Sequence, residues 1–114
     1  MFFGAQDGLF HLFSTDGWNS SAFVHASSPD LIEWSAQRLI PIMESIPGVK
    51  NVWAPECFFE HETGCYRVLW SSTVGGAEYD HRIWSSTSRD LETFSPPQLF
   101  IDPGFNVIDA TIRP

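Results

Sequence analysis

Apolar and polar positions alternate along the chain in short runs, which are separated by clusters of Gly, Pro, Ser and Asp. The runs are rich in β-branched and aromatic residues, and no window shows a sustained helical period of about 3.6 residues with caps. The pattern therefore predicts an all-β protein. The predicted strands are residues 9–14, 22–27, 38–42, 56–60, 65–72, 81–87, 98–101 and 107–112.

Two stretches of the chain occur twice. Residues 9–14 align with residues 66–71 at an offset of 57, and residues 28–35 align with residues 88–95 at an offset of 60. The repeating unit is a four-stranded meander. Such units, repeated every ~40 to 60 residues, are typical of β-propeller blades.

The repeat divides the chain into parts of one propeller domain. We expect a partial first blade in residues 1–45, a whole second blade in residues 46–103 and the inner strand of a third blade in residues 104–114. The chain then begins and ends inside the repeat, and we interpret it as a fragment. Unpaired blade edges with exposed Phe, Trp and Leu favour self-association, so we expect oligomers or aggregates.

The stretches Ser28–Trp34 and Ser88–Phe94 share the pattern Ser-x-Asp-Leu-x-x-aromatic. Ser and Asp side chains commonly cap the backbone N–H groups of tight turns. We expect these two to do so, while the Leu and the aromatic residue of each stretch pack between blades.

Charge limits the class of ligand. The chain has 14 acidic and 6 basic side chains, a net charge of −8, and Lys50 is its single lysine. It lacks a basic stripe that could neutralise phosphates, so we expect neither nucleic acid nor an anionic membrane as partner. A neutral ligand fits better. No apolar run approaches the ~18 residues of a membrane span, and residues 1–4 lack the features of a signal peptide.

Cys57 and Cys65 flank the turn-forming stretch His61–Gly64. If the flanks form a hairpin in which Glu60 faces Cys65, then Cys57 faces Val68 and the two sulfurs lie on opposite faces of the sheet. We therefore expect two free thiols. A second Cys or His pair that could complete a zinc site is missing nearby, and we expect no metal ion and no cofactor.

Four motifs resemble glycoside hydrolase family 43. They are Val52–Phe59 with its Trp-Ala-Pro-acid sequence, the strand that ends in Trp70-Ser71-Ser72, the turn Ser28–Trp34, and Ile108-Asp109-Ala110. The resemblance runs the length of the chain. It implies a five-bladed propeller that hydrolyses glycosidic bonds with inversion, typically in polysaccharides that contain arabinose or xylose.

Members of this family carry three carboxylates on inner strands: a general base, a general acid, and an Asp that raises the pKa of the acid and orients the substrate. By this resemblance Asp109 matches the third. The base would precede Met1, because Ala54 holds the equivalent position in the second blade, and the acid would follow Pro114. The chain alone is then expected to be inactive.

From the residues alone, Asp109 has two readings. A charged residue between Ile108 and Ala110 either lines a polar cavity or is satisfied by turn amides at a strand end. Glu56 either lies near the pocket or is a structural hydrogen-bond partner. Glu56-Cys57 also invites comparison with the fructosidases of family 32, whose acid Glu precedes Cys, although the flanking residues differ.

Two ring side chains are further candidates for binding a carbohydrate. Trp53 either stacks on a sugar face or packs between blades, where we expect the other four tryptophans, Trp18, Trp34, Trp70 and Trp84. His81 follows the Gly-rich stretch 75–80 and is either a rim residue or an ordinary surface histidine. Besides a hydrolase, we retain two alternatives for the function of this chain: a glycan-binding propeller without catalysis, and an inactive fragment.

Overall fold

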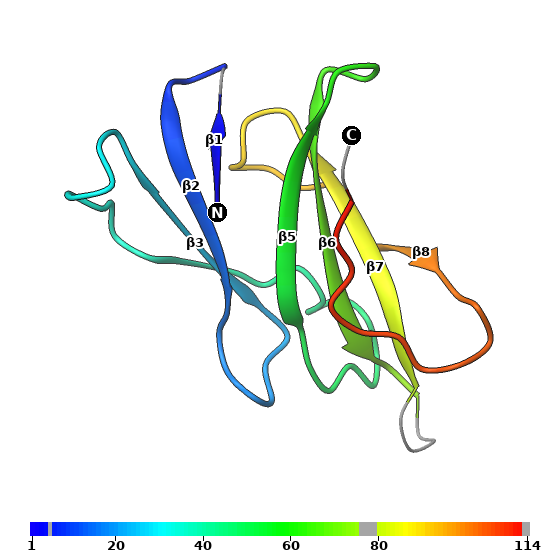
Figure 1. Ribbon diagram of the computed structural model, residues 1–114. Helices are drawn as coiled ribbons and strands as arrows, with labels where there is room; N and C mark the ends of the chain where they lie inside the picture. Colours follow the sequence, from blue (N-terminus) through cyan, green and yellow to red (C-terminus); the bar gives the residue numbers. More distant parts are fainter. Residues whose placement is uncertain (5, 76–79, 113–114) are drawn as a thin grey trace.

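The computed structural model describes residues 1–4, 6–75 and 80–112, and it consists of two four-stranded antiparallel sheets (Figure 1). The strands of each sheet follow one another in chain order, so each sheet is a meander, as in a propeller blade. The first sheet contains β1 (Phe2–Gly4), β2 (Leu9–Thr15), β3 (Phe23–Ser28) and β4 (Arg38–Ile40). The second contains β5 (Trp53–Glu60), β6 (Cys65–Thr73), β7 (His81–Ser88) and β8 (Gln98–Ile101).

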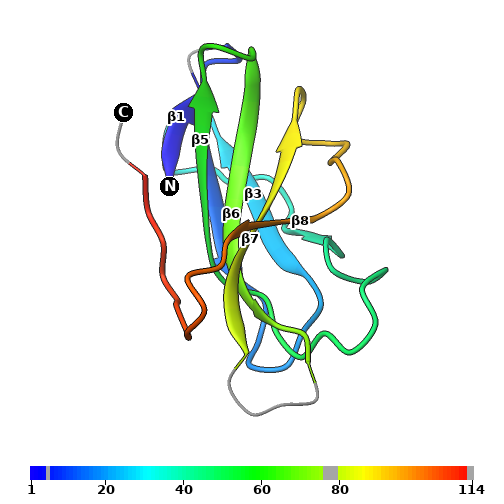
Figure 2. The same ribbon diagram turned by 90° about the vertical axis from the view of Figure 1, so that its right-hand side faces the viewer.

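The all-β prediction and the blade-like meander are confirmed. The described residues contain no helix, and so none that could cross a membrane. β5 begins three residues before the predicted strand, at Trp53, and its register with β6 shifts between Trp53 and Glu56. The predicted strand 107–112 is wrong: this segment lies beside the second sheet without joining it as a strand (Figure 2). β5 is paired with β6 along its length, whereas residues 107–112 contact the second sheet through isolated hydrogen bonds such as those from the N–H groups of Val107 and Asp109.

The register of the repeat differs by one residue from the sequence alignment. Phe10 pairs with Ser28, and Tyr66 pairs with Ser88, the residue equivalent to Ser28. The middle strands are therefore related by an offset of 56, not 57. Phe13 thus corresponds to Leu69 rather than to Trp70. A slip of one residue exchanges the two faces of a strand, and the aromatic residues at both positions hid this slip in the sequence.

The cysteine hairpin has the predicted register. Glu60 pairs with Cys65, Cys57 pairs with Val68, and both thiols are free. Gly64 turns the chain with φ of 70°, a conformation that costs glycine little, and its N–H donates to the Glu60 carbonyl at 2.9 Å.

Both Ser-x-Asp-Leu turns are capped as predicted. The Ser28 and Ser88 hydroxyl oxygens accept the N–H groups of Leu31 and Leu91, each at 2.8 Å. The Asp30 and Asp90 carboxylates each accept two further backbone N–H groups at 2.9 Å, and these bonds hold the pKa of both carboxyls below the usual range.

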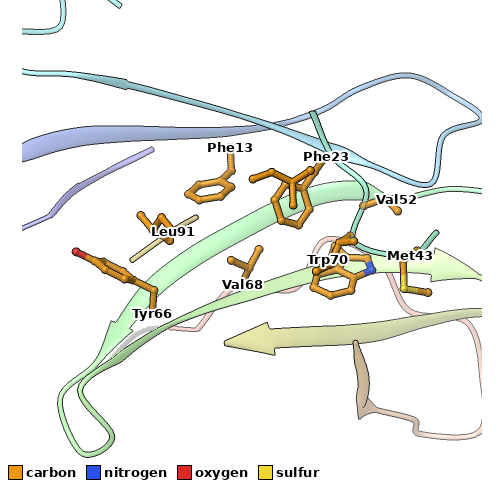
Figure 3. Packing of buried hydrophobic residues seen from close by; sticks show 10 residues of the cluster. Phe13, Phe23, Met43, Val52, Tyr66, Val68, Trp70 and Leu91 are labelled. Carbon is orange, nitrogen blue, oxygen red and sulfur yellow. The ribbon is translucent and has the colours of Figure 1, made fainter. Parts of the chain in front are cut away.

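The hydrophobic core lies between the two sheets (Figure 3). Phe13 and Phe23 of the first sheet face Val68 and Trp70 of the second. The Phe13 and Phe23 rings meet edge to face, and the Phe23 ring is tilted against the Trp70 ring. The connection between the sheets closes this core from one side with Met43 and Val52, both fully buried. The core therefore belongs to the contact between the sheets, as expected of stacked blades.

Candidate functional site

The candidate site lies where β5 begins and where residues 107–112 run beside it. These segments meet the ends of β2 and β6 and the start of β7 at one end of the sheets, the lower end in Figure 1. Ala54 and Asp109, which the sequence placed at equivalent positions, both have left-handed backbone, with φ of 48° and 58°. This conformation costs a residue with a side chain roughly 1–2 kcal/mol, so surrounding contacts must stabilise it.

One such contact is repeated. The N–H of Ala54 donates to Thr15 Oγ1 at 2.9 Å, and the N–H of Asp109 donates to Ser71 Oγ at 3.1 Å. Thr15 and Ser71 are equivalent under the offset of 56, because each pairs with the corresponding residue of the next strand. A hydroxyl of the preceding blade thus fixes the start of each inner segment.

Asp109 and Glu56 line one open cavity of about 220 Å³, together with Ala54, Ala110 and Thr111. The Thr111 hydroxyl donates to Glu56 Oε1 at 3.1 Å. Asp109 is exposed, and among the described residues no hydrogen bond or ion pair holds its carboxylate. Its carboxylate is thus available to a ligand, while one oxygen of Glu56 is engaged.

Trp53 and His81 line a second open pocket, of about 270 Å³, which adjoins the first through the peptide bond between Trp53 and Ala54. The two rings stack with centroids 5.1 Å apart, and His81 Nδ1 is 2.7 Å from the Thr73 hydroxyl. The structure thus brings the four candidate residues into two neighbouring pockets. Residues 76–79 of the Gly-rich stretch before His81 lie outside the described residues.

The expectation that Trp18 packs between blades is wrong. Its side chain is 76% exposed, it lies 4.8 Å from the Trp53 ring between centroids, and its carbonyl accepts the Trp53 indole N–H at 3.0 Å. Trp34 is 39% exposed, whereas Trp70 is buried and Trp84 packs against the core as expected.

Five residues of the second pocket were not among the candidates: Trp18, Asn19, Lys50, Asn51 and Thr73. The stretch Asp16-Gly17-Trp18-Asn19 has turn composition around one large aromatic residue, which was the available signal. None of the clusters of His, Cys, Asp and Glu in the described ranges is arranged to hold a metal ion.

Comparison of the sequence with known proteins identifies its family. Residues 7–114 match the family model of a "Probable glycosyl hydrolase domain" related to glycoside hydrolase family 43. The chain belongs to this family.

A curated relative is an alpha-L-arabinofuranosidase of Bifidobacterium longum subsp. longum. It is 26% identical over 134 residues, a match that covers 91% of this chain and 12% of the relative. The chain therefore spans a small part of that protein's length. No solved structure matches.

Proposed function

We propose that these residues form part of the substrate cavity of a glycoside hydrolase that acts with inversion on arabinose- or xylose-containing glycans. The observation that carries this proposal is the Asp109 carboxylate, which is exposed and unpaired among the described residues. It has left-handed backbone and is held by the Ser71 hydroxyl, so the start of this segment is fixed in place. Membership of the family and the arabinofuranosidase relative support the same reading.

Asp109 alone cannot carry out inversion. The reaction needs one carboxylic acid at the leaving oxygen and one carboxylate that activates water on the opposite face, about 6.5 to 9.5 Å apart. In our proposal Asp109 is neither: its negative charge raises the pKa of the acid and its oxygens orient a sugar hydroxyl. The base and the acid are supplied by further blades of a longer protein, in keeping with the short span of the relative that this chain covers.

The deciding experiment uses a longer protein that carries residues 1–114 together with the further blades. Asp109→Asn should lower kcat on aryl arabinosides or xylosides, and the basic limb of the pH profile should move to lower pH. The shift follows because loss of a neighbouring negative charge lowers the pKa of the acid. Glu62→Gln, an exposed carboxylate in the β5–β6 turn, is the matched control and should change neither quantity.

Two results would contradict the assignment. A folded Asp109→Asn variant with the kcat and pH profile of the parent protein would make Asp109 structural. Hydrolysis by the 114-residue chain itself, lost in Glu56→Gln, would mean that Glu56 is the reacting carboxylate. We expect no hydrolysis by this chain, since a general acid and a general base each contribute about 10²- to 10⁴-fold.

A further inference from the structure

The most exposed tryptophan of the chain lies beside the candidate cavity. The β2–β3 connection, residues 16–22, carries Trp18, which is 76% exposed. A large aromatic surface left in water next to a pocket, rather than scattered singly, indicates a binding surface.

The connection that carries Trp18 is held in place. Ser20 Oγ donates to Asp16 Oδ2 at 2.8 Å and accepts the N–H of Ala22 at 3.1 Å. The Trp53 indole N–H binds the Trp18 carbonyl, so β5 anchors the connection as well. Because these hydrogen bonds already order the connection, a ligand that stacks on Trp18 binds without a large entropic cost of ordering the protein.

The neighbouring aromatic side chain is less accessible. The Trp53 ring contacts both Trp18, with centroids 4.8 Å apart, and His81, with centroids 5.1 Å apart, and it is only half-exposed. The exposed aromatic surface of this pocket is therefore that of Trp18, and the Trp53 ring packs against it.

The chemistry around Trp18 suits a sugar. A pyranose or furanose ring presents an apolar C–H face to an indole and hydroxyl groups at its rim. The Lys50 ammonium and the Asn19 amide line the same pocket, and they supply donors and one acceptor for such hydroxyls. Trp53 of this pocket and Ala54 of the Asp109 cavity are consecutive residues, so the two openings lie near each other.

We propose that Trp18 is a sugar-stacking residue that binds a neutral glycan unit next to the Asp109 cavity, and that Trp53 is its positioning residue. The inference rests on the proposed function for the identity of the ligand. Its experimental test is separate, because it measures binding to this chain and not hydrolysis.

The test titrates the 114-residue chain with linear arabinotriose and with xylotriose, followed by calorimetry and by the indole N–H signals in NMR spectra. We expect binding of at least one trisaccharide, with the Trp18 indole signal among those that shift. Trp18→Ala should weaken binding about tenfold or more, the loss of one stacked aromatic side chain, and Trp18→Phe should retain most of it. Trp34→Ala, which removes another exposed tryptophan in the Ser28–Trp34 turn, is the matched control and should bind as the parent chain does.

The positioning role of Trp53 has its own readout. Trp53→Phe keeps a ring beside Trp18 but removes the N–H donor, so the Trp18 indole signal should move in the free chain and binding should weaken. An unchanged Trp18 signal would overturn that role.

Different results would contradict the role of Trp18 and the proposed function. Binding by Trp18→Ala with the parent affinity, or no binding of either trisaccharide by the parent chain, overturns the role of Trp18. In the longer protein, Trp18→Ala should raise KM for an oligosaccharide by more than it raises KM for a small aryl glycoside. If the longer protein hydrolyses neither class of substrate, the proposed function fails, whatever the chain binds.

Discussion

The two sheets have the same meander of four strands but differ in which parts of the molecule pack on them. In the second sheet Leu91 of the Ser-x-Asp-Leu turn is 2% exposed, because the first sheet packs on that face. In the first sheet the equivalent Leu31 is 44% exposed, and no described element covers it. Both leucines have left-handed backbone and the same capping bonds. The local turn is thus a property of the motif, whereas burial of its leucine depends on a neighbouring blade.

The sheets also differ in their buried polar groups. In the first sheet His11 Nε2 binds the Asp7 carboxylate at 2.8 Å and His11 Nδ1 lies 3.0 Å from His25 Nε2. At the equivalent place in the second sheet, Arg67 donates to Ser85 Oγ at 3.1 Å. Both sheets satisfy these positions by hydrogen bonds, as burial requires, but only the first does so with a pair of imidazole side chains.

The largest difference between the sheets should appear on truncation of the two leucines. Leu91→Ala leaves a cavity in the core and should lower the free energy of unfolding by about 2–5 kcal/mol. Leu31→Ala should change it by about 0.5 kcal/mol or less, since the side chain is on the surface. Urea unfolding of both variants measures this. Equal losses would mean that Leu31 is also covered in solution.

The turn serines should behave alike in the two sheets. Ser28 and Ser88 are both buried, and each accepts the N–H of the leucine three residues later. Ser28→Ala and Ser88→Ala each leave that N–H without its partner, so each should cost about 1–3 kcal/mol in the same unfolding experiment. A cost confined to one sheet would show that the turns are not independent local units.

Lowering the pH should reduce the free energy of unfolding through His25, which lies in the first sheet. Burial, with the nearby Arg38 and His11 charges, lowers the pKa of His25 to about 4, despite the opposing charge of Asp7. The unfolded chain, with a His pKa of about 6.5, then binds more protons than the folded chain, so unfolding free energy should fall as pH decreases from about 6.5 to about 4.

The control for this pH dependence is a pair of variants. His25→Gln should reduce the slope of unfolding free energy against pH in that window, and His61→Gln in the exposed β5–β6 turn should leave it as in the parent chain. An unchanged slope in His25→Gln would assign the acid sensitivity to other groups.

The smallest effect concerns the thiols, which test the hairpin register on which the comparison of sheets depends. Titration of the denatured chain without reductant should find two thiols. In the folded chain Cys57 should react more slowly than Cys65, because burial raises the pKa of the Cys57 thiol. Detection of no thiol would indicate a disulfide and overturn the register of β5 with β6.

Much of the fold was predictable from local pattern. Turn residues, alternation and the double Ser-x-Asp-Leu motif predicted the strands and the meander, and the spacing of Cys57, Gly64 and Cys65 predicted the hairpin register. The equivalence of Ala54 and Asp109 was also predictable, and their shared left-handed backbone agrees with it. The roles of Asp109, Glu56, Trp53 and His81 remain predictions, although the structure places these residues in two adjoining pockets.

Other features depend on contacts between distant residues. Neither the face of Phe13 nor the exposure of Trp18 could be predicted, because a strand of mixed aromatic and polar residues can be aligned in two registers and a turn tryptophan can face either way. Residues 107–112 have strand composition, yet a strand needs a hydrogen-bonded neighbour. The conformational preferences of consecutive residues determine turns and hairpins, so the sequence by itself determined these elements. Burial and pocket geometry arise where separate segments meet, and only the tertiary structure decided them.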